Sequence, residues 1–394
     1  MVKLAWEQLD KMRTPVYAYD YQEIEARCIN LQTALTEEIE LFYSEKANPN
    51  MQLLKKIKEL TKGVEVASGP ELENAIAAGY SLENIIFVGP GKTGEELAFA
   101  SEKQIYCIVC ESLEEMIKIN EIGGKLQKKV SCAIRVNPVM ANAGNRMKMG
   151  GVARPFGIDE EKVYEVLESI MNLPFVNMIG IYVYNGTQNL SIDKICEGFQ
   201  GIFEIALKCE QVAGKRIEFI GLGGGYGVPY FEGESELDMD VLRQKVTELL
   251  HEYLPRFSRS LRLVSESGRY LVAAGGYYIV RVLYKKESRG KKFLIVDGGT
   301  NFFSAPSGMG HFLRRKFPVS IIQKEKSIGE ECVSIVGPLC TPTDELMHDE
   351  LLPAADVNDF IVFRNAGAYG LTASPMFFLS HELPDEIIWR EEDR

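Results

Sequence analysis

A lysine follows the short apolar run 40–43, in the segment Tyr43-Ser44-Glu45-Lys46-Ala47-Asn48. An unpaired ammonium is costly to bury, so such a lysine either extends its charge into water or is kept for chemistry. A lysine held at the mouth of a barrel can form a Schiff base with a carbonyl compound. The rest of the sequence favours this second interpretation.

Further short apolar runs also end on charged residues, a tyrosine or glycine-rich turns. In chain order these strand ends are Glu65, Gly89-Pro90-Gly91-Lys92, Glu111, Arg135, Tyr184, Gly223-Gly224-Gly225 and Glu266. One such residue could be a charge on the rim of a barrel. Because the C-terminal ends of parallel strands share one face, a ring of them predicts an active site.

Glycines 223–225 predict a phosphate-binding turn, since residues without side chains leave the backbone N–H groups accessible. A dinucleotide-binding loop is disfavoured, because the GxGxxG pattern would need a glycine at Tyr226 or Val228. Arg269 follows Glu266 closely and could add a charge-assisted contact to the same phosphate.

A Schiff-base lysine, a phosphate-binding turn and a carboxylate together indicate pyridoxal 5'-phosphate as the cofactor. A carboxylate beside the pyridine nitrogen keeps that nitrogen protonated, which makes the ring an electron sink for the carbanion left when Cα loses CO2. An arginine at this place would suit racemisation better. Glu266 therefore favours decarboxylation.

The spacing of the apolar runs predicts a (β/α)8 TIM barrel, because eight strand-like runs alternate with helical segments over about 230 residues. A strand at 16–19 and a helix at 21–35 precede the first unit. The predicted barrel strands are 40–45, 63–67, 85–88, 106–110, 131–136, 177–184, 216–220 and 262–266. The predicted helices are 70–79, 94–102, 112–126, 159–171, 192–213 and 239–255.

Beyond Glu266 the helical periodicity almost disappears. Strand-like runs separated by Gly, Pro and Asp turns predict a mostly antiparallel C-terminal β domain, at 277–285, 292–296, 333–336 and 360–364. We expect a cofactor-binding barrel at 22–266 and a β-sandwich or β-barrel domain formed by 1–21 and 267–394.

The composition, with 46% hydrophobic and 25% charged residues, is that of an ordinary globular protein. A net charge of −12 argues against nucleic acid or an anionic membrane as a partner. Since no apolar run approaches the ~20 residues of a membrane span and no signal peptide is recognisable, we expect a cytoplasmic protein. Cys107 and Cys110 lack a second pair or a neighbouring histidine, so no metal site is predicted.

Five motifs resemble those of the fold type III (alanine-racemase-like) pyridoxal-phosphate decarboxylases, the family of diaminopimelate and ornithine decarboxylases. They are Tyr43 to Asn48 (the family's Y-x-x-K-A-N), Gly223 to Gly225, Glu266-Ser267-Gly268-Arg269 (the family's E-P-G-R), Gly337-Pro338-Leu339-Cys340 and Ala366-Gly367-Ala368-Tyr369. They occur in the family's order along nearly the whole chain. The resemblance implies a lyase that removes CO2 from an L-amino acid.

The resemblance also implies roles for single residues. Lys46 would bond to the cofactor's aldehyde, Glu266 would contact the pyridine nitrogen, and Cys340 would donate a proton to the substrate from the partner subunit of a homodimer. The phosphate would be held by Thr187, Gly223, Gly224, Gly225, Arg269 and Tyr369. Glu65, Arg135 and Tyr184 are further cofactor-binding candidates, and Thr341 and Asp344 are substrate-binding candidates.

Two departures from the family pattern bear on the substrate. Where the family usually has H-x-G-S-Q, this chain has Tyr184-Asn185-Gly186-Thr187-Gln188, so that Tyr184 could stack on the ring without an imidazolium charge. The Arg-Pro-x-Leu-Tyr clamp of diaminopimelate decarboxylases is replaced by Thr300-Asn301-Phe302-Phe303-Ser304-Ala305. Free diaminopimelate is therefore not the expected substrate.

Segments 147–152, 184–190, 266–271 and 337–342 are similar to a butirosin-pathway decarboxylase that acts on glutamate tethered to an acyl-carrier protein. Segments 89–93 and 366–381 resemble siderophore-pathway decarboxylases of citrate-conjugated amino acids. We therefore expect a carrier-linked or conjugated L-amino acid, in a secondary-metabolite or siderophore pathway. An acyl-carrier protein is the candidate partner, and Arg314-Arg315-Lys316 is a candidate dock for it.

Three alternatives stay open at this point. One is a decarboxylase of free diaminopimelate, lysine or ornithine. Another is a racemase, which Glu266 disfavours. The last is a non-catalytic binding homologue, which is disfavoured because Lys46, Glu266, Arg269, Cys340 and Tyr369 are all present.

Overall fold

The computed structural model describes residues 5–139, 154–184, 186–213, 217–231, 233–258, 260–307, 317–326 and 328–389. The segment 147–152 and the candidate dock at 314–316 lie outside these residues. Two compact units are formed, one by Arg27–Val228 with Ser235–Tyr270, and one by Met1–Ala26 with Pro229–Glu234 and Leu271–Arg394. The boundaries thus differ by a few residues from those expected at 21–22 and 266–267, and 229–234 joins the β unit.

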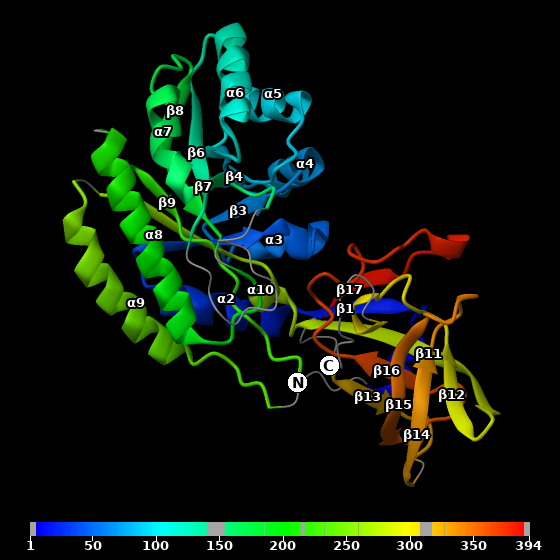
Figure 1. Cartoon of the computed structure of the whole chain (residues 1–394). Helices are drawn as coiled ribbons and strands as arrows, with labels where there is room; N and C mark the ends of the chain where they lie inside the picture. The colour runs from blue at the N-terminus through cyan, green and yellow to red at the C-terminus, as the bar shows by residue number, and fades with distance from the viewer. Residues whose placement is uncertain are drawn as a thin grey trace. The chain divides into compact units, whose positions relative to one another are not determined.

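The larger unit contains a closed barrel of eight parallel strands, as expected, and Figure 1 shows it enclosed by helices. The pairings of β10 with β2 and of β5 with β6 close the barrel. The two-residue strand β7 (Ile158–Asp159) pairs with β6 outside the closed ring. The barrel strands are β2 (Ile39–Ser44), β3 (Gly63–Val66), β4 (Ile85–Phe87), β5 (Cys107–Cys110), β6 (Val130–Asn137), β8 (Val176–Val183), β9 (Phe219–Gly221) and β10 (Arg262–Ser267).

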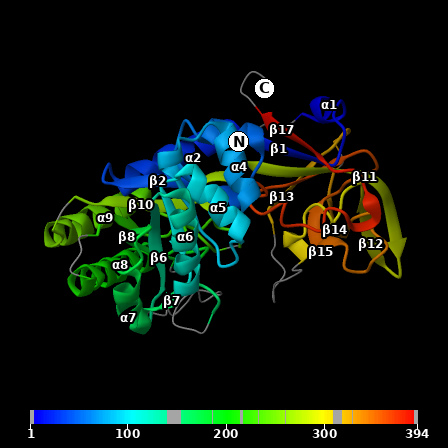
Figure 2. The same cartoon turned by 90° about the horizontal axis from the view of Figure 1, so that it is seen from above.

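The outer helices are α2 (Tyr21–Leu35), α3 (Met51–Ile57), α4 (Gly69–Ala78), α5 (Gly94–Lys103), α6 (Leu113–Leu126), α7 (Glu160–Ile170), α8 (Ile192–Ala213) and α9 (Met239–Tyr253). Several begin at a polar cap, since the hydroxyls of Ser68, Thr93 and Ser112 accept hydrogen bonds from backbone N–H groups of the first turn. In Figure 2, α5 and α6 lie side by side on the outside of the barrel. Helix α3 was not predicted, because seven residues hardly develop a helical period.

The strands of the barrel are apolar on both faces, as expected for a parallel sheet covered by helices. Phe42, Val109, Phe219 and Val264 belong to a buried cluster of inward side chains. Fully burying a side chain of this size contributes about 1.5–3 kcal/mol, so this layer supports the strand ends above it.

The smaller unit is a β domain whose central order is β13-β16-β11-β12-β14-β15. Strand β1 (Val16–Asp20) pairs antiparallel with β11 and parallel with β17 (Asp385–Trp389). The pair β12–β14 is also parallel, and the other pairings are antiparallel. The remaining elements are α1 (Trp6–Leu9), α10 (Arg269–Val272), β11 (Gly276–Ser288), β12 (Lys291–Val296), β13 (Val319–Ile322), β14 (Glu330–Val336), β15 (Glu345–Pro353) and β16 (Phe360–Phe363).

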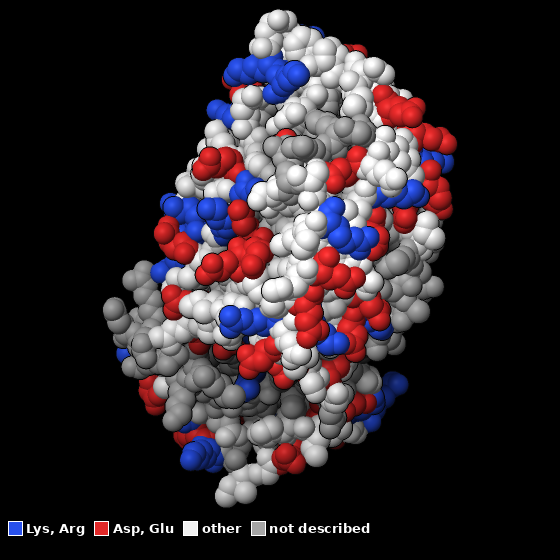
Figure 3. All heavy atoms as spheres, turned by 90° about the vertical axis from the view of Figure 1, so that its left-hand side faces the viewer, with Lys and Arg blue, Asp and Glu red and all other residues white. Residues whose placement is uncertain are grey.

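Acidic and basic side chains intermingle on the face of the molecule shown in Figure 3. Within the described ranges, no helix combines the length and the apolar character that crossing a bilayer requires. The same residues contain no group of three or more His, Cys, Asp or Glu side chains placed to hold a metal ion.

Candidate active site

Lys46 lies in a short 3-10 turn (Glu45–Ala47) directly after β2. Its Nζ is 2.6 Å from Oε1 of Glu65, which belongs to the neighbouring strand β3. The lysine side chain is 37% exposed, whereas that of Glu65 is 2% exposed. Burial alone would raise the pKa of Glu65, but the charge and hydrogen bond of Lys46, helped by Tyr182, lower it. Glu65 is therefore an anion that fixes the amine at the strand end.

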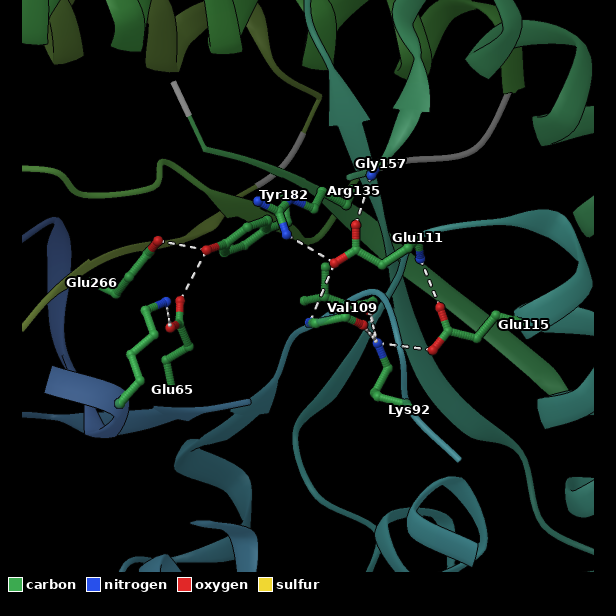
Figure 4. Close-up of polar contacts among 11 residues, drawn as sticks. Glu65, Lys92, Val109, Glu111, Glu115, Arg135, Gly157, Tyr182 and Glu266 are labelled. Carbon is green, nitrogen blue, oxygen red and sulfur yellow. Dashed lines mark hydrogen bonds and ion pairs between the residues drawn. The ribbon is translucent and has the colours of Figure 1, made fainter. Parts of the chain in front are cut away.

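Tyr182 of β8 reaches across the barrel to both inner carboxyl groups, as Figure 4 shows. Its hydroxyl oxygen is 2.9 Å from Oε2 of Glu65 and 2.5 Å from Oε1 of Glu266. Burial and the negative charge of Glu65 raise the pKa of Glu266 to about 8. Glu266 is therefore mostly protonated at neutral pH in the protein alone. Tyr182 was not predicted from the sequence, although it lies two residues before the candidate Tyr184, a spacing that places side chains on one face of an extended chain.

The second oxygen of Glu266 gives a test of whether the residues fit pyridoxal phosphate. Oε2 of Glu266 is buried and makes no hydrogen bond with any residue that the structure describes. A buried polar atom without a partner is rare, and at a functional site it marks a place for a ligand group. A pyridine nitrogen fits this requirement, because a carboxyl group can share a proton with it.

The glycine turn after β9 is shaped by its neighbours. Gly223 and Gly225 have φ angles of +67° and +86°, a region that favours glycine. A Cβ at Gly224 would overlap the carbonyl oxygen of Glu266, and one at Gly225 would overlap that of Gly186. A Cβ at Gly225 would also lie 3.4 Å from the Cα of Thr187, so the structure brings Thr187 to the turn. This arrangement fits a phosphate group held by backbone N–H groups.

Arg135 of β6 and Glu111, which directly follows β5, form a second, buried ion pair at the strand ends. Arg135 Nη1 lies 2.8 Å from Glu111 Oε1, and Glu111 also accepts hydrogen bonds from the backbone N–H groups of Gly157 and Gly89. Burial opposes the charge of Arg135, but Tyr182 and Glu111 raise the pKa of the guanidinium. Glu111 therefore holds Arg135 and two loops together.

Lys92 is the last residue of the turn 89–92, and its buried ammonium group binds back to this turn and to the neighbouring strand β5. Its side chain is 1% exposed and its Nζ lies 2.6 Å from the carbonyl oxygen of Gly89, 2.8 Å from that of Val109 and 2.8 Å from Glu115. These contacts occupy its three donors. Lys92 therefore stabilises the turn, and a contact of this turn with a ligand stays a prediction.

Two further candidates of the barrel unit flank this network. The ring centroid of Tyr184 lies 5.9 Å from the Nζ of Lys46, within reach of a cation–π contact. Arg269 begins the short helix α10 after Glu266 and is half-buried. Its contact with a phosphate stays a prediction.

The candidates of the β unit lie on two of its loops. Cys340 is exposed, whereas Asp344 is 3% exposed. The Asp344 carboxylate accepts hydrogen bonds from the backbone N–H and hydroxyl of Thr300 and from the N–H of Leu339. Asp344 therefore fixes the loop that carries Cys340, while a direct contact of this carboxylate or of Thr341 with a substrate stays a prediction.

Tyr369 lies on the other loop and has a φ angle of 53°, which is uncommon for a residue with a side chain. Such a conformation persists only where the surroundings enforce it, often at functional sites. Its role as a phosphate ligand also stays a prediction.

The family model, the curated relatives and the solved structures that match this chain all point to pyridoxal-dependent decarboxylases. Residues 21–273 match the family model of the pyridoxal binding domain of pyridoxal-dependent decarboxylases. The L-glutamyl-[BtrI acyl-carrier protein] decarboxylase of Niallia circulans is 41% identical, over 96% of this chain and 90% of that protein.

Two other relatives differ in the substrate that their names give. The diaminopimelate decarboxylase of Campylobacter jejuni is 32% identical, over 92% of this chain and 88% of that protein. The 2-[(L-alanin-3-ylcarbamoyl)methyl]-2-hydroxybutanedioate decarboxylase of Staphylococcus aureus is 31% identical, over 97% and 96%. Among solved structures, diaminopimelate decarboxylase from M. jannaschii superposes with a TM-score of 0.89 at 26% identity, over 98% of this chain and 90% of that one.

Proposed function

The chain belongs to the pyridoxal-dependent decarboxylases, and we propose that its substrate is an L-amino acid whose far end is linked to a carrier protein or another large group. It is an enzyme that uses pyridoxal phosphate to remove CO2 from an amino acid. When bound, the cofactor supplies the electron sink that stabilises the carbanion. What distinguishes this chain within the family is therefore the substrate.

The observation that carries the substrate proposal is the similarity to the carrier-linked glutamate decarboxylase along nearly the whole chain. The relative from Staphylococcus aureus acts, by its name, on an alanine unit joined to a hydroxybutanedioate group. Both names describe an amino acid with a large substituent. A site for such a substrate must leave the distal end of the amino acid open.

The segment that replaces the distal clamp supports this proposal. Asn301, Phe302 and Phe303 are fully buried, and the Tyr17 hydroxyl donates a hydrogen bond to the carbonyl oxygen of Phe302 at 2.7 Å. Phe303 packs against the rings of Tyr17 and Phe317. These side chains fill the core of the β unit, where a diaminopimelate-type clamp would present an arginine to the substrate.

We assign the site residues as follows. Lys46 supplies the amine that bonds to the cofactor, and Glu65 holds that amine in place. Glu266 faces the ring nitrogen through Oε2, which has no hydrogen-bond partner among the described residues. Tyr184 and Arg135 flank the ring, and Gly223 to Gly225, Thr187 and Arg269 hold the phosphate, with Tyr369 as a further candidate. Cys340 supplies the proton that replaces CO2 on the substrate.

We further propose a cytoplasmic homodimer in which Cys340 of one subunit serves the barrel of the other. Cys340 is exposed, and the buried carboxylate of Asp344 holds the loop that carries it. A thiol that serves another subunit must be accessible and held in a fixed position, and this loop meets both requirements. The carrier would be an acyl-carrier protein of a secondary-metabolite pathway. Its dock at 314–316 stays a proposal.

A second candidate is a decarboxylase of free diamino acids. The 32% identity to the Campylobacter jejuni enzyme and the fold shared with diaminopimelate decarboxylases favour it. In that case a free diamino acid would have to bind without the replaced clamp.

Release of CO2 from a panel of amino acids decides between the two candidates. The panel contains free glutamate, lysine, ornithine and diaminopimelate, citrate-linked diamino acids, and aminoacyl groups loaded on an acyl-carrier protein. We expect kcat/KM to be at least 100-fold higher for a linked substrate than for the matching free amino acid. A higher value for free diaminopimelate or lysine would overturn the proposal.

A further inference from the structure

A single hydroxyl group stands between the two inner carboxyl groups of the barrel. The oxygen of Tyr182 lies within hydrogen-bonding distance of both Glu65 and Glu266. A tyrosine hydroxyl carries one hydrogen, so it can donate only one of the two bonds. The other bond must be donated by a protonated carboxyl group.

The surrounding charges decide which carboxyl group carries the proton. Glu65 has the ammonium of Lys46 at 2.6 Å, which favours its ionised form. Glu266 is fully buried and takes part in no ion pair within the described part of the chain, and its pKa is raised to about 8. In the cofactor-free protein, Glu266 therefore donates to Tyr182, Tyr182 donates to Glu65, and Glu65 pairs with Lys46.

The position of Tyr182 in the barrel suits this bridging role. Its strand β8 lies opposite β3 in the closed order β3-β4-β5-β6-β8, so its side chain spans the interior. The guanidinium carbon of Arg135 lies 5.7 Å from its ring centroid. Tyr184 directly follows the end of this strand, two residues further along the chain toward the mouth of the barrel. Tyr182 is thus in the layer directly beneath the proposed cofactor ring.

We propose that Tyr182 is a positioning residue which holds Oε1 of Glu266 and makes this carboxyl group acidic enough to leave its proton on the ring nitrogen of the cofactor. This inference rests on the proposed placement of Glu266 beside the ring nitrogen. When the proton moves to that nitrogen, the Tyr182 hydroxyl can turn and donate to the Glu266 anion. A hydrogen bond to an anion is stronger than one to a neutral acid, so the bridge favours the ionised carboxylate.

The test compares Tyr182→Phe with Tyr253→Phe. Tyr253 is a matched control, because it is also buried and its hydroxyl donates a 2.7 Å hydrogen bond to a glutamate, Glu204, on the outer helices. Apoprotein of each variant is refilled with pyridoxal phosphate labelled with 15N in the ring. The dissociation constant of the cofactor and the 15N chemical shift of the ring nitrogen are then measured without substrate.

In Tyr182→Phe we expect the 15N signal to move toward that of an unprotonated pyridine and the dissociation constant to rise about tenfold. Tyr253→Phe should match the unmodified enzyme in both measurements. A Tyr182→Phe enzyme with an unchanged signal and affinity would overturn the proposal.

A second variant keeps the proposal testable if Tyr182→Phe does not fold. In Glu65→Gln the negative charge that opposes ionisation of Glu266 is removed, and the Tyr182 hydroxyl is freed to donate to Glu266. The ring signal should then move toward the protonated value, opposite to Tyr182→Phe; a shift in the same direction would contradict the bridge. Because no substrate is present, failure of the CO2-release panel would leave this result unaffected.

Discussion

Lys46 Nζ and Glu65 Oε1 lie 2.6 Å apart although 19 residues separate them in the chain, because β2 and β3 are neighbours in the barrel. The carboxylate is buried and the amine is partly open to solvent. This asymmetry presents the amine to a ligand while its counter-ion stays fixed.

Lys46→Ala should abolish the absorption band of the lysine-bound cofactor and lower CO2 release to background, since among the described residues only the Lys46 amine pairs with Glu65. Absorption spectra of the purified protein check this. Lys245→Ala is the control, because Lys245 is paired with Asp193 at 2.5 Å on the outer surface of the barrel. A yellow, active Lys46→Ala enzyme would contradict the assignment.

Glu266→Gln should keep the cofactor bound but lower kcat by about 10² or more, because an amide cannot supply the ring nitrogen with a proton. The comparison of cofactor content with the single-turnover rate separates binding from chemistry. Glu218→Gln serves as the control, because Glu218 is exposed and directly precedes β9, at the opposite end of the strand from the glycine turn of the site. Equal rates for the two variants would argue against the ring contact.

Glu45→Gln should stabilise the protein, and increasingly so as the pH rises. Burial and the nearby charge of Glu71 raise the pKa of Glu45 to about 8 from its usual 4.5. Folding therefore favours the protonated form, so its contribution is fully present below pH 4.5 and is lost progressively as the pH rises toward 8. At pH 7 the variant should gain on the order of 3 kcal/mol in the free energy of unfolding.

Denaturant unfolding at several pH values between 5 and 8 measures this gain. Glu266 has a similarly raised pKa and gives a trend of the same sign, so the difference between variant and unmodified protein is the relevant quantity. A difference that does not grow with pH would show that Glu45 does not titrate in this range.

Cys340→Ala should lower kcat by roughly 10²-fold or more without loss of cofactor, because proton donation by a positioned group contributes that much to a rate. Its side chain is exposed, so the thermal midpoint should stay the same. Cys332→Ala is a matched control, since Cys332 is exposed in the same unit. If both variants were equally active, Cys340 would not be the proton donor.

Asp344→Asn distinguishes a loop-holding carboxylate from a substrate ligand. Loss of charge-assisted hydrogen bonds from Thr300 and Leu339 should cost about 1–3 kcal/mol of stability and lower kcat, because the loop that carries Cys340 loosens. A direct substrate contact would raise KM in addition to this loss of stability. Steady-state kinetics and denaturant unfolding of the same sample give both quantities.

The sequence by itself determined most of the barrel and the candidates for the chemistry. Its strands and helices have local signatures, such as the apolar run 85–88 that became β4 and the periodic segment 192–213 that became α8. Lys46, Glu65 and Glu266 were found because residues at the C-terminal ends of parallel strands converge on one face. Strands β13, β15 and β17 were missed, since they are partly exposed and carry no continuous apolar run.

Only the tertiary structure decided which of these groups are paired and which oxygen is left for a ligand. Tyr182 and Glu266 are 84 residues apart in sequence, and their contact exists because the closed barrel brings β8 and β10 around one interior. In the same way, folding turned Lys92 toward Glu115 and its own loop, and left Oε2 of Glu266 without a partner among the described residues. Residue type and spacing identify groups that can react, whereas burial and neighbouring charges, which arise only on folding, set their protonation and their direction.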